Sequence, residues 1–128
     1  MTPKWALPLA GINVALSIVI GAFGAHSLRE KVPAESMVIF HTGAQYHQIQ
    51  AIGALLILLL LDRCSVPKRA FAGFALILVG CLLFSGSLYA LAATGTRMLG
   101  MITPFGGVAF ITGWLLVAFS GLVPTEQA

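Results

Sequence analysis

The residues of this chain that are best suited to chemistry lie together between positions 40 and 50. Imidazole binds zinc, copper or iron and carries protons, while amide and phenol groups donate and accept hydrogen bonds. The polar side chains of this stretch belong to His41, Gln45, Tyr46, His47, Gln48 and Gln50. They permit three kinds of site: a hydrogen-bonded helix contact, a conduit for protons or a small solute, or a holder for haem or a metal.

A second set of polar side chains lies near the ends of two other apolar runs. His26 follows the first run, and Ser85, Ser87 and Tyr89 lie in the second half of a later one. Helices that alternate in direction would bring these segments to the side from which residues 40–50 start. We therefore predict one polar cluster made of both sets.

The spacing of the histidines argues against a metal centre. His41 and His47 are about 240° apart around a helix, at about 100° per residue, so they do not point at one ion. No cysteine or carboxylate with ligand spacing accompanies them. We therefore predict no metal and no cofactor, and we expect the histidines to be interfacial or hydrogen-bonded.

The composition assigns the chain to the membrane proteins. Of its 128 residues, 59% are hydrophobic and 9% are charged, and the mean hydropathy is +0.98. So little polar surface does not coat a soluble globule. Because a helix needs about 20 apolar residues to cross a bilayer, the length predicts an all-α integral membrane four-helix bundle, a single domain over residues 1–128.

Charged and proline-containing segments divide the chain into the apolar spans. The predicted helices cover residues of about 5–25, 36–61, 70–93 and 103–123. The positive start and the small residues around Ala22 also fit a cleaved signal peptide, so retention of the first helix is an expectation.

Small and polar residues predict how these helices meet. Asn13 should point into the bundle and hydrogen-bond a neighbouring helix, because an unpaired amide in lipid is costly. Glycines let helix backbones approach closely. The predicted packing positions are Gly21, Gly24, Gly86, Gly106 and Gly107.

The seven Lys and Arg residues are scattered through the loops, which excludes a nucleic-acid interface and leaves them as topology signals. Those on the side of the termini are Lys4, Arg63, Lys68 and Arg69, and those on the other side are Arg29, Lys31 and Arg97. The concentration of charge in the second loop favours cytoplasmic termini and places the polar cluster near the outer leaflet.

Catalysis and transport find little support in the sequence. It has no nucleophile with a base and an orienting group at recognisable spacing, no phosphate-binding loop and no pair of carboxylates within a span. A conduit would use the polar cluster, but no acidic residue lies within an apolar span and no inverted repeat is visible. We therefore expect no enzymatic activity.

Several motifs in combination resemble a known family. They are Gly21-Ala-Phe-Gly-Ala-His26, the segment 42–46, and the segment 84–89 followed by 103–107 and Gly113-Trp114. Together they are similar to the YgdD-like family of small bacterial inner-membrane proteins, a domain of unknown function. The resemblance covers nearly the whole chain and implies four membrane helices without an established activity. The family pattern has a histidine where this chain has Gln50. His47 is a helical neighbour of position 50, so a shifted imidazole could serve the same space. The departure equally implies that no strict metal or haem ligand is required there.

The sequence thus predicts a small accessory or membrane-organising protein that acts by interaction. Its partner would be the lipid bilayer, a second copy of the chain or another membrane protein. A small-solute or proton conduit is the alternative function, and a membrane protein that holds haem or a metal is the third.

Overall fold

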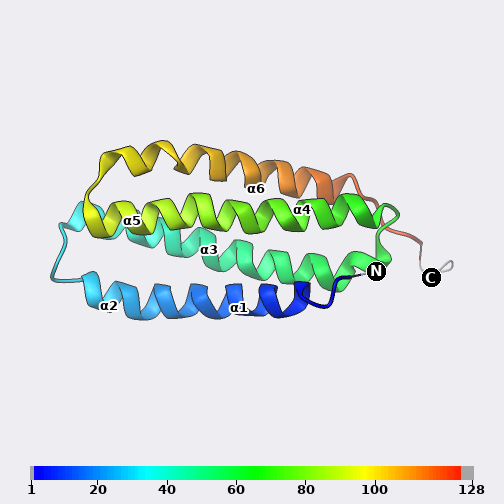
Figure 1. Cartoon of the computed structure of the whole chain (residues 1–128), viewed down its shortest axis with the longest axis horizontal. Coiled ribbons are helices and arrows are strands. Elements are labelled where there is room, and N and C mark those ends of the chain that lie inside the picture. The colour runs from blue at the N-terminus through cyan, green and yellow to red at the C-terminus, as the bar shows by residue number, and fades with distance from the viewer. Residues whose placement is uncertain (1, 125–128) are drawn as a thin grey trace.

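The computed structural model describes residues 2–124 and is all-α (Figure 1). Within these residues, helical segments join end to end into four rods that are each long and apolar enough to cross a membrane. The rods are Ala6–Leu28, Ala34–Arg63, Pro67–Thr94 and Arg97–Ala118. Their segments are α1 Ala6–Val19, η1 Ile20–Gly24, α2 Ala25–Leu28, α3 Ala34–Leu60, η2 Leu61–Arg63, α4 Pro67–Gly80, η3 Cys81–Ser85, α5 Gly86–Thr94, η4 Arg97–Met101 and α6 Thr103–Ala118.

Proline and glycine set the ends of the rods. Pro33 precedes α3 with an extended ψ of 156°, and Pro67 lies in the first turn of α4, where its missing N–H is not needed. Gly95 ends α5 with a φ of 70°, a left-handed conformation that a residue without Cβ adopts easily. The first three predicted helices agree with the rods, which run a few residues further because the flanking polar residues remain helical.

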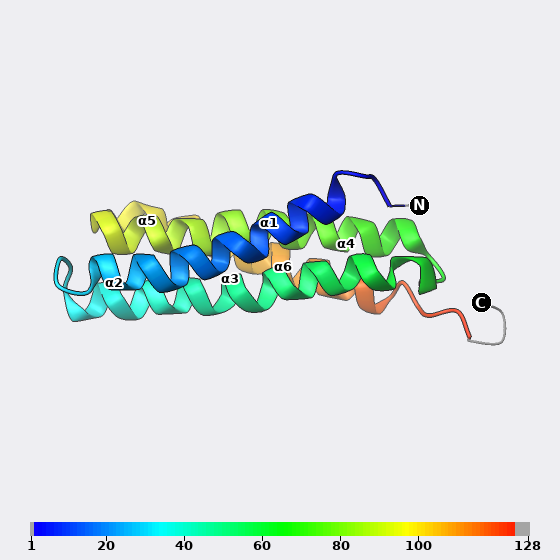
Figure 2. The ribbon, with the colours of Figure 1, turned by 90° about the horizontal axis from the view of Figure 1, so that it is seen from below.

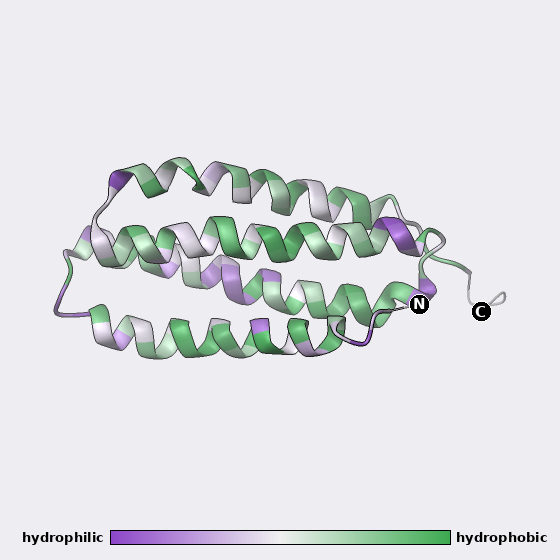
Figure 3. Ribbon diagram, in the orientation of Figure 1, coloured by the Kyte–Doolittle hydropathy of each residue, from purple (hydrophilic) through white to green (hydrophobic). Residues whose placement is uncertain are grey.

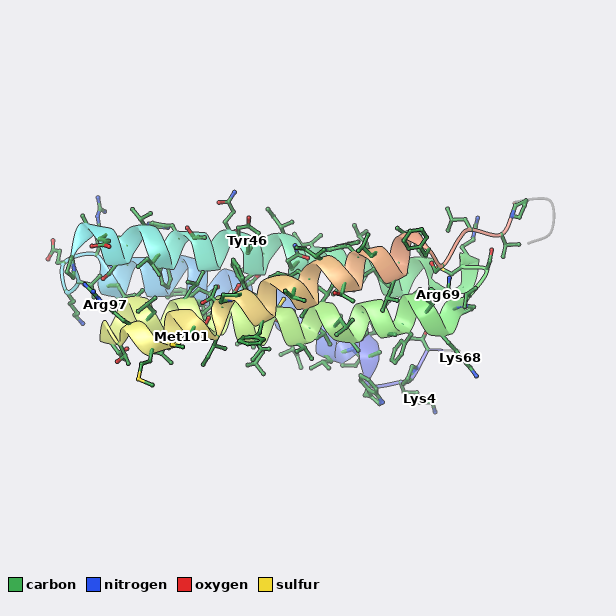
Figure 4. The ribbon with its side chains drawn as sticks, turned by 90° about the horizontal axis from the view of Figure 1, so that it is seen from above. Lys4, Tyr46, Lys68, Arg69, Arg97 and Met101 are labelled. Atoms are coloured by element: carbon green, nitrogen blue, oxygen red, sulfur yellow. The ribbon has the colours of Figure 1, made fainter. Side chains whose placement is uncertain are left out.

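The rods lie side by side and alternate in direction (Figures 1 and 2). Residues 2–5, the loop 64–66 and residues 119–124 lie at one end, which we call the terminal end. The loops 29–33 and 95–96 lie at the other, which we call the loop end. Lys4, Lys68 and Arg69 accordingly project at the terminal end, and Arg97 lies at the loop end (Figure 4). This arrangement confirms the predicted four-helix bundle.

The two middle rods carry most of the packing. α3 contacts α1 on one side and α4 and α5 on the other, while α6 packs along α4 and η3. The larger apolar core fills the terminal half of the molecule and includes Ile57, Leu61, Phe74, Ile77 and Phe110. A smaller one around Phe40 lies in the loop half.

Two of the rods contain a π-helical turn. These turns are η1 in the first rod and η3 in the third. A π turn is usually a single wide turn within an α-helix. η3 packs against both α3 and α6, and it ends at the fully buried Ser85.

The fourth helix begins and ends earlier than the sequence predicted, because η4 extends it back to Arg97. The prediction extended it to residue 123, but α6 ends at Ala118 and Gly121 has a φ of 63°. The chain then passes the loop 64–66 in the antiparallel direction. There the Ser65 N–H donates to the Gly121 carbonyl at 3.0 Å, and the Val66 N–H donates to the Ser120 carbonyl at 3.0 Å. Hydropathy did not predict this end, because the residues beyond Ala118 remain largely apolar.

Two glycines bring the backbones of α4 and α6 together. A Cβ on Gly73 would lie 2.6 Å from the carbonyl oxygen of Gly113, and a Cβ on Gly113 would lie 2.9 Å from the carbonyl oxygen of Gly73. Real side chains do not pack at such distances, so this contact requires glycine on both helices. The sequence prediction missed this pair.

Most of the predicted packing glycines do lie at helix contacts. They are Gly21 against Gln48, Gly24 against Phe40, and Gly106 and Gly107 against Phe84. The prediction is wrong at Gly86, because a Cβ at that position would meet no atom within 4 Å. Its neighbours Ser85 and Ser87 face the bundle instead, and both are buried.

Substitution of these glycines by alanine tests the packing. Gly113→Ala should lower the free energy of unfolding by about 1–3 kcal/mol, because the new methyl group overlaps the α4 backbone. Gly86→Ala, in open space within a helix, should leave it unchanged or raise it by up to about 1 kcal/mol. Unfolding by SDS in mixed micelles measures both, and equal effects of the two variants would contradict the described contact.

Candidate functional site

The charged residues at the ends of the rods set the depth of the polar side chains. From Glu35 to Asp62 the second rod extends about 40 Å along its axis, at 1.5 Å per residue. This length matches a bilayer of about 40–45 Å with its headgroups. The polar part of α3 therefore lies near the middle of the bilayer, and Figure 3 shows hydrophilic colour in the central part of that helix.

His47 lies at the centre of a buried hydrogen-bonded group. Its side chain is 6% exposed. Its Nε2 is 2.9 Å from Asn13 Oδ1 on α1, and its Nδ1 is 2.9 Å from Tyr89 Oη on α5. The Asn13 amide nitrogen in turn lies 3.7 Å from Cys81 Sγ in η3. We call Asn13, His47, Tyr89 and Cys81 the polar node, and Asn13 makes the interhelical bond that the sequence predicted.

The donors and acceptors of the polar node select one tautomer of a neutral imidazole. With its nitrogen directed at Cys81, Asn13 presents its carbonyl oxygen to His47, and a carbonyl only accepts. The imidazole therefore donates from Nε2, and as a neutral ring it accepts the Tyr89 hydroxyl proton at Nδ1. Every bond runs in one direction, from Tyr89 through His47 and Asn13 to Cys81. An amide does not readily take up and release a proton, so this chain is not suited to proton transfer.

The two serines of the cluster add a second contact between the second and third rods and a contact between the third and fourth rods. Ser85 Oγ donates to the Gly43 carbonyl at 2.8 Å, which ties η3 to α3. Ser87 Oγ is 2.7 Å from Thr103 Oγ1 at the start of α6. Both serine side chains are buried, so they serve contacts between helices.

Gln50 and Tyr46 face a groove between α3 and α6. The Trp114 Nε1 donates to Gln50 Oε1 at 2.7 Å, and the Tyr46 ring packs on Phe84 with 4.7 Å between centroids. The groove holds about 600 Å³, and Phe110 contributes to its apolar wall. Its mainly apolar lining suits a hydrocarbon chain, such as that of a lipid.

The remaining members of the predicted cluster lie on the outside. Gln45 and His41 are exposed on α3, and the exposed Gln48 donates to the Ser17 carbonyl of α1 at 3.4 Å. His26 is also exposed and shares a hollow of about 360 Å³ with His41 at the loop end. The structure thus separates two histidines at the surface from a third in the interior. Within residues 2–124, His, Cys, Asp and Glu side chains form no group of three or more that could hold a metal.

Comparison with known proteins identifies the family. The profile described as "Protein of unknown function (DUF423)" matches residues 20–107. The chain belongs to the DUF423 family. The matched segment contains every member of the predicted polar cluster, whereas Asn13 and Trp114, which hydrogen-bond two of them, lie outside it.

Its relatives are named as membrane proteins, and the chain matches them along nearly their whole length. The UPF0382 membrane protein YwdK of Bacillus subtilis is 43% identical over 115 residues, which cover 89% of this chain and 93% of the relative. The UPF0382 inner membrane protein YgdD of Escherichia coli (strain K12) is 33% identical over 117 residues, which cover 91% and 88%. No solved structure matches. These names confirm the predicted family, and they agree with the prediction of a membrane protein without an established activity.

The hydrogen-bond partners of the polar cluster in this DUF423 protein were only partly predictable. Asn13 is the only amide of the first rod, so its need for a polar partner was evident. Trp114 and Thr103 were missed as partners of Gln50 and Ser87, because both also fit the roles that helix ends and membrane aromatics commonly play. Their pairing depends on the way α6 packs, which no local pattern specifies.

A double-mutant cycle tests the polar node. His47→Leu and Tyr89→Phe each remove one side of a hydrogen bond, so their effects on the unfolding free energy should be coupled by about 0.6 kcal/mol, and at most about 1.7 kcal/mol. His41→Leu provides the control, because no hydrogen bond joins His41 to Tyr89 within the described residues. Its coupling with Tyr89→Phe should be zero. Additive effects in the His47 cycle would refute the described bond.

Proposed function

We propose that this protein is a small accessory or membrane-organising protein that acts by binding another molecule through the outer face of α3. The observation that carries this proposal is the exposed amide of Gln45. Within residues 2–124, the hydrogen bonds of the α3 side chains involve Thr42, His47, Gln48 and Gln50. None involves Gln45.

The depth of Gln45 makes its exposure costly. Gln45 lies about 15 Å along the helix axis from Glu35, at 1.5 Å per residue. A polar group without a partner in an apolar medium costs roughly 2–7 kcal/mol, and lipid tails offer no hydrogen bond. A molecule that covers α3 and pairs with this amide would remove the cost.

The conduit finds less support in the same geometry. The polar side chains of α3 stop at Gln50, and the terminal half of the molecule is filled by the apolar core around Ile57, Phe74 and Phe110. A continuous path would have to cross this core. The polar node also contains an amide in its chain of donors, which is unsuited to moving protons.

Photocrosslinking tests the proposed binding face. A benzophenone amino acid at Ile49, which is 59% exposed one turn beyond Gln45, should give a discrete protein adduct in intact membranes. The same probe at Leu82, 73% exposed on the third rod, should give lipid adducts alone. Gln45→Leu should reduce the yield of the Ile49 adduct. If the Ile49 and Leu82 probes behave alike, the proposal fails.

We further propose that both termini face the cytoplasm. Four basic residues lie at the terminal end and three at the loop end, and the more basic side is retained inside. In a background of Cys64→Ala and Cys81→Ala, a membrane-impermeant maleimide added to intact cells should label Ser27→Cys, which lies near the loop end. It should label Ser65→Cys only after the cells are broken. The reverse pattern would invert the topology.

A further inference from the structure

The exposed face of α3 carries a heptad pattern. Val38, Gln45, Ile52 and Leu59 recur every seven residues, and Ile49 and Leu56 lie between them at steps of four and three. This spacing of 3.5 residues is that of a left-handed coiled-coil seam. The apolar members are 51% to 66% exposed, so no other part of the described chain covers them. We call these six residues the α3 seam.

The α3 seam has the length and position of a membrane contact. From Val38 to Leu59 it extends about 31 Å, at 1.5 Å per residue, which matches a hydrocarbon core of about 30 Å. α1 packs on one flank of α3, and α4 and α5 pack on another. Figure 4 shows α3 along one edge of the molecule, with side chains that project away from the other helices. A further helix can therefore lie along the α3 seam.

We propose that the α3 seam binds the same seam of a second copy of this chain, in a parallel dimer with Gln45 paired to its counterpart across the two-fold axis. This inference rests on the proposed function and names its partner. Two copies inserted in the same direction carry Gln45 at the same depth, so a two-fold axis along the membrane normal brings the two amides face to face.

The α3 seams of two copies are electrostatically complementary to each other. An amide has a positive NH₂ group and a negative carbonyl oxygen, so each Gln45 can donate to and accept from its counterpart. The seam contains no charged residue that would be repelled by its own copy. A single amide at a core position of a coiled coil fixes the register and the number of strands. Amides also hydrogen-bond across helices within membranes. A partner with a purely apolar helix would satisfy the five apolar residues but not Gln45.

Energy transfer between labelled copies measures the dimer. Full-length protein carrying a donor or an acceptor dye at its N-terminus is mixed in vesicles of phosphatidylethanolamine and phosphatidylglycerol over a range of protein-to-lipid ratios. Gln45→Leu should weaken association by roughly three- to seventeen-fold, the range given by membrane hydrogen bonds. Gln45→Leu with Ile52→Gln should restore it, because Ile52 occupies the same seam position one heptad later. Gln45→Leu with Leu82→Gln should not.

Disulfide formation gives the geometry independently of Gln45. In the Cys64→Ala, Cys81→Ala background, single cysteines at Val38 and at Leu59 should each crosslink to the same position of the second copy, while a cysteine at Leu82 should not. Crosslinks between Val38→Cys and Leu59→Cys chains, or crosslinks at Leu82→Cys, would overturn the parallel arrangement.

The outcome also separates this inference from the proposed function. Energy transfer no greater than that expected from random proximity would overturn the dimer. If the Ile49 photoprobe still captured a different protein, the interaction function would stand without it. If energy transfer showed no dimer and the Ile49 photoprobe also captured no protein, both the dimer and the interaction function would be refuted.

Discussion

The structure depends on the rule that an amide, imidazole or phenol in hydrocarbon must find a partner within the protein. His47 obeys it most fully, with Asn13 on one ring nitrogen and Tyr89 on the other. These bonds join α1, α3 and α5, so the lateral positions of three rods are set at one level of the bilayer. Such bonds are individually weak in membranes, and their main effect is to exclude other registers.

The two halves of the bundle are held together by different means. The terminal half relies on an apolar core and on the backbone contact of Gly73 with Gly113. The loop half has a smaller apolar core and adds hydrogen bonds between side chains of different rods. Close packing by small residues stabilises helix contacts in lipid, where the hydrophobic effect does not drive helices together. The polar contacts provide specificity where the apolar contacts are fewer.

Much of this architecture could be predicted from the sequence. The apolar spans, the alternation of their directions and the inward position of Asn13 follow from lengths, charges and the cost of an unpaired amide. The role of individual side chains was harder to predict. Gln45 and His47 are two residues apart and chemically similar in the pattern, yet one is exposed and the other is buried. Their fates depend on which side of α3 receives α1 and α5, and that is a product of tertiary packing.

The face that the third rod presents to the fourth continues through the π turn η3. Its contacts with α6 recur every seven residues, where Gly73, Gly80 and Ser87 meet Gly113, Phe110 and Thr103 in that order. Residues at this spacing stay on nearly the same side of an α-helix, within about 40° over fourteen residues. The two rods can therefore lie close together along most of their length, because the same side of the third rod returns at each new depth.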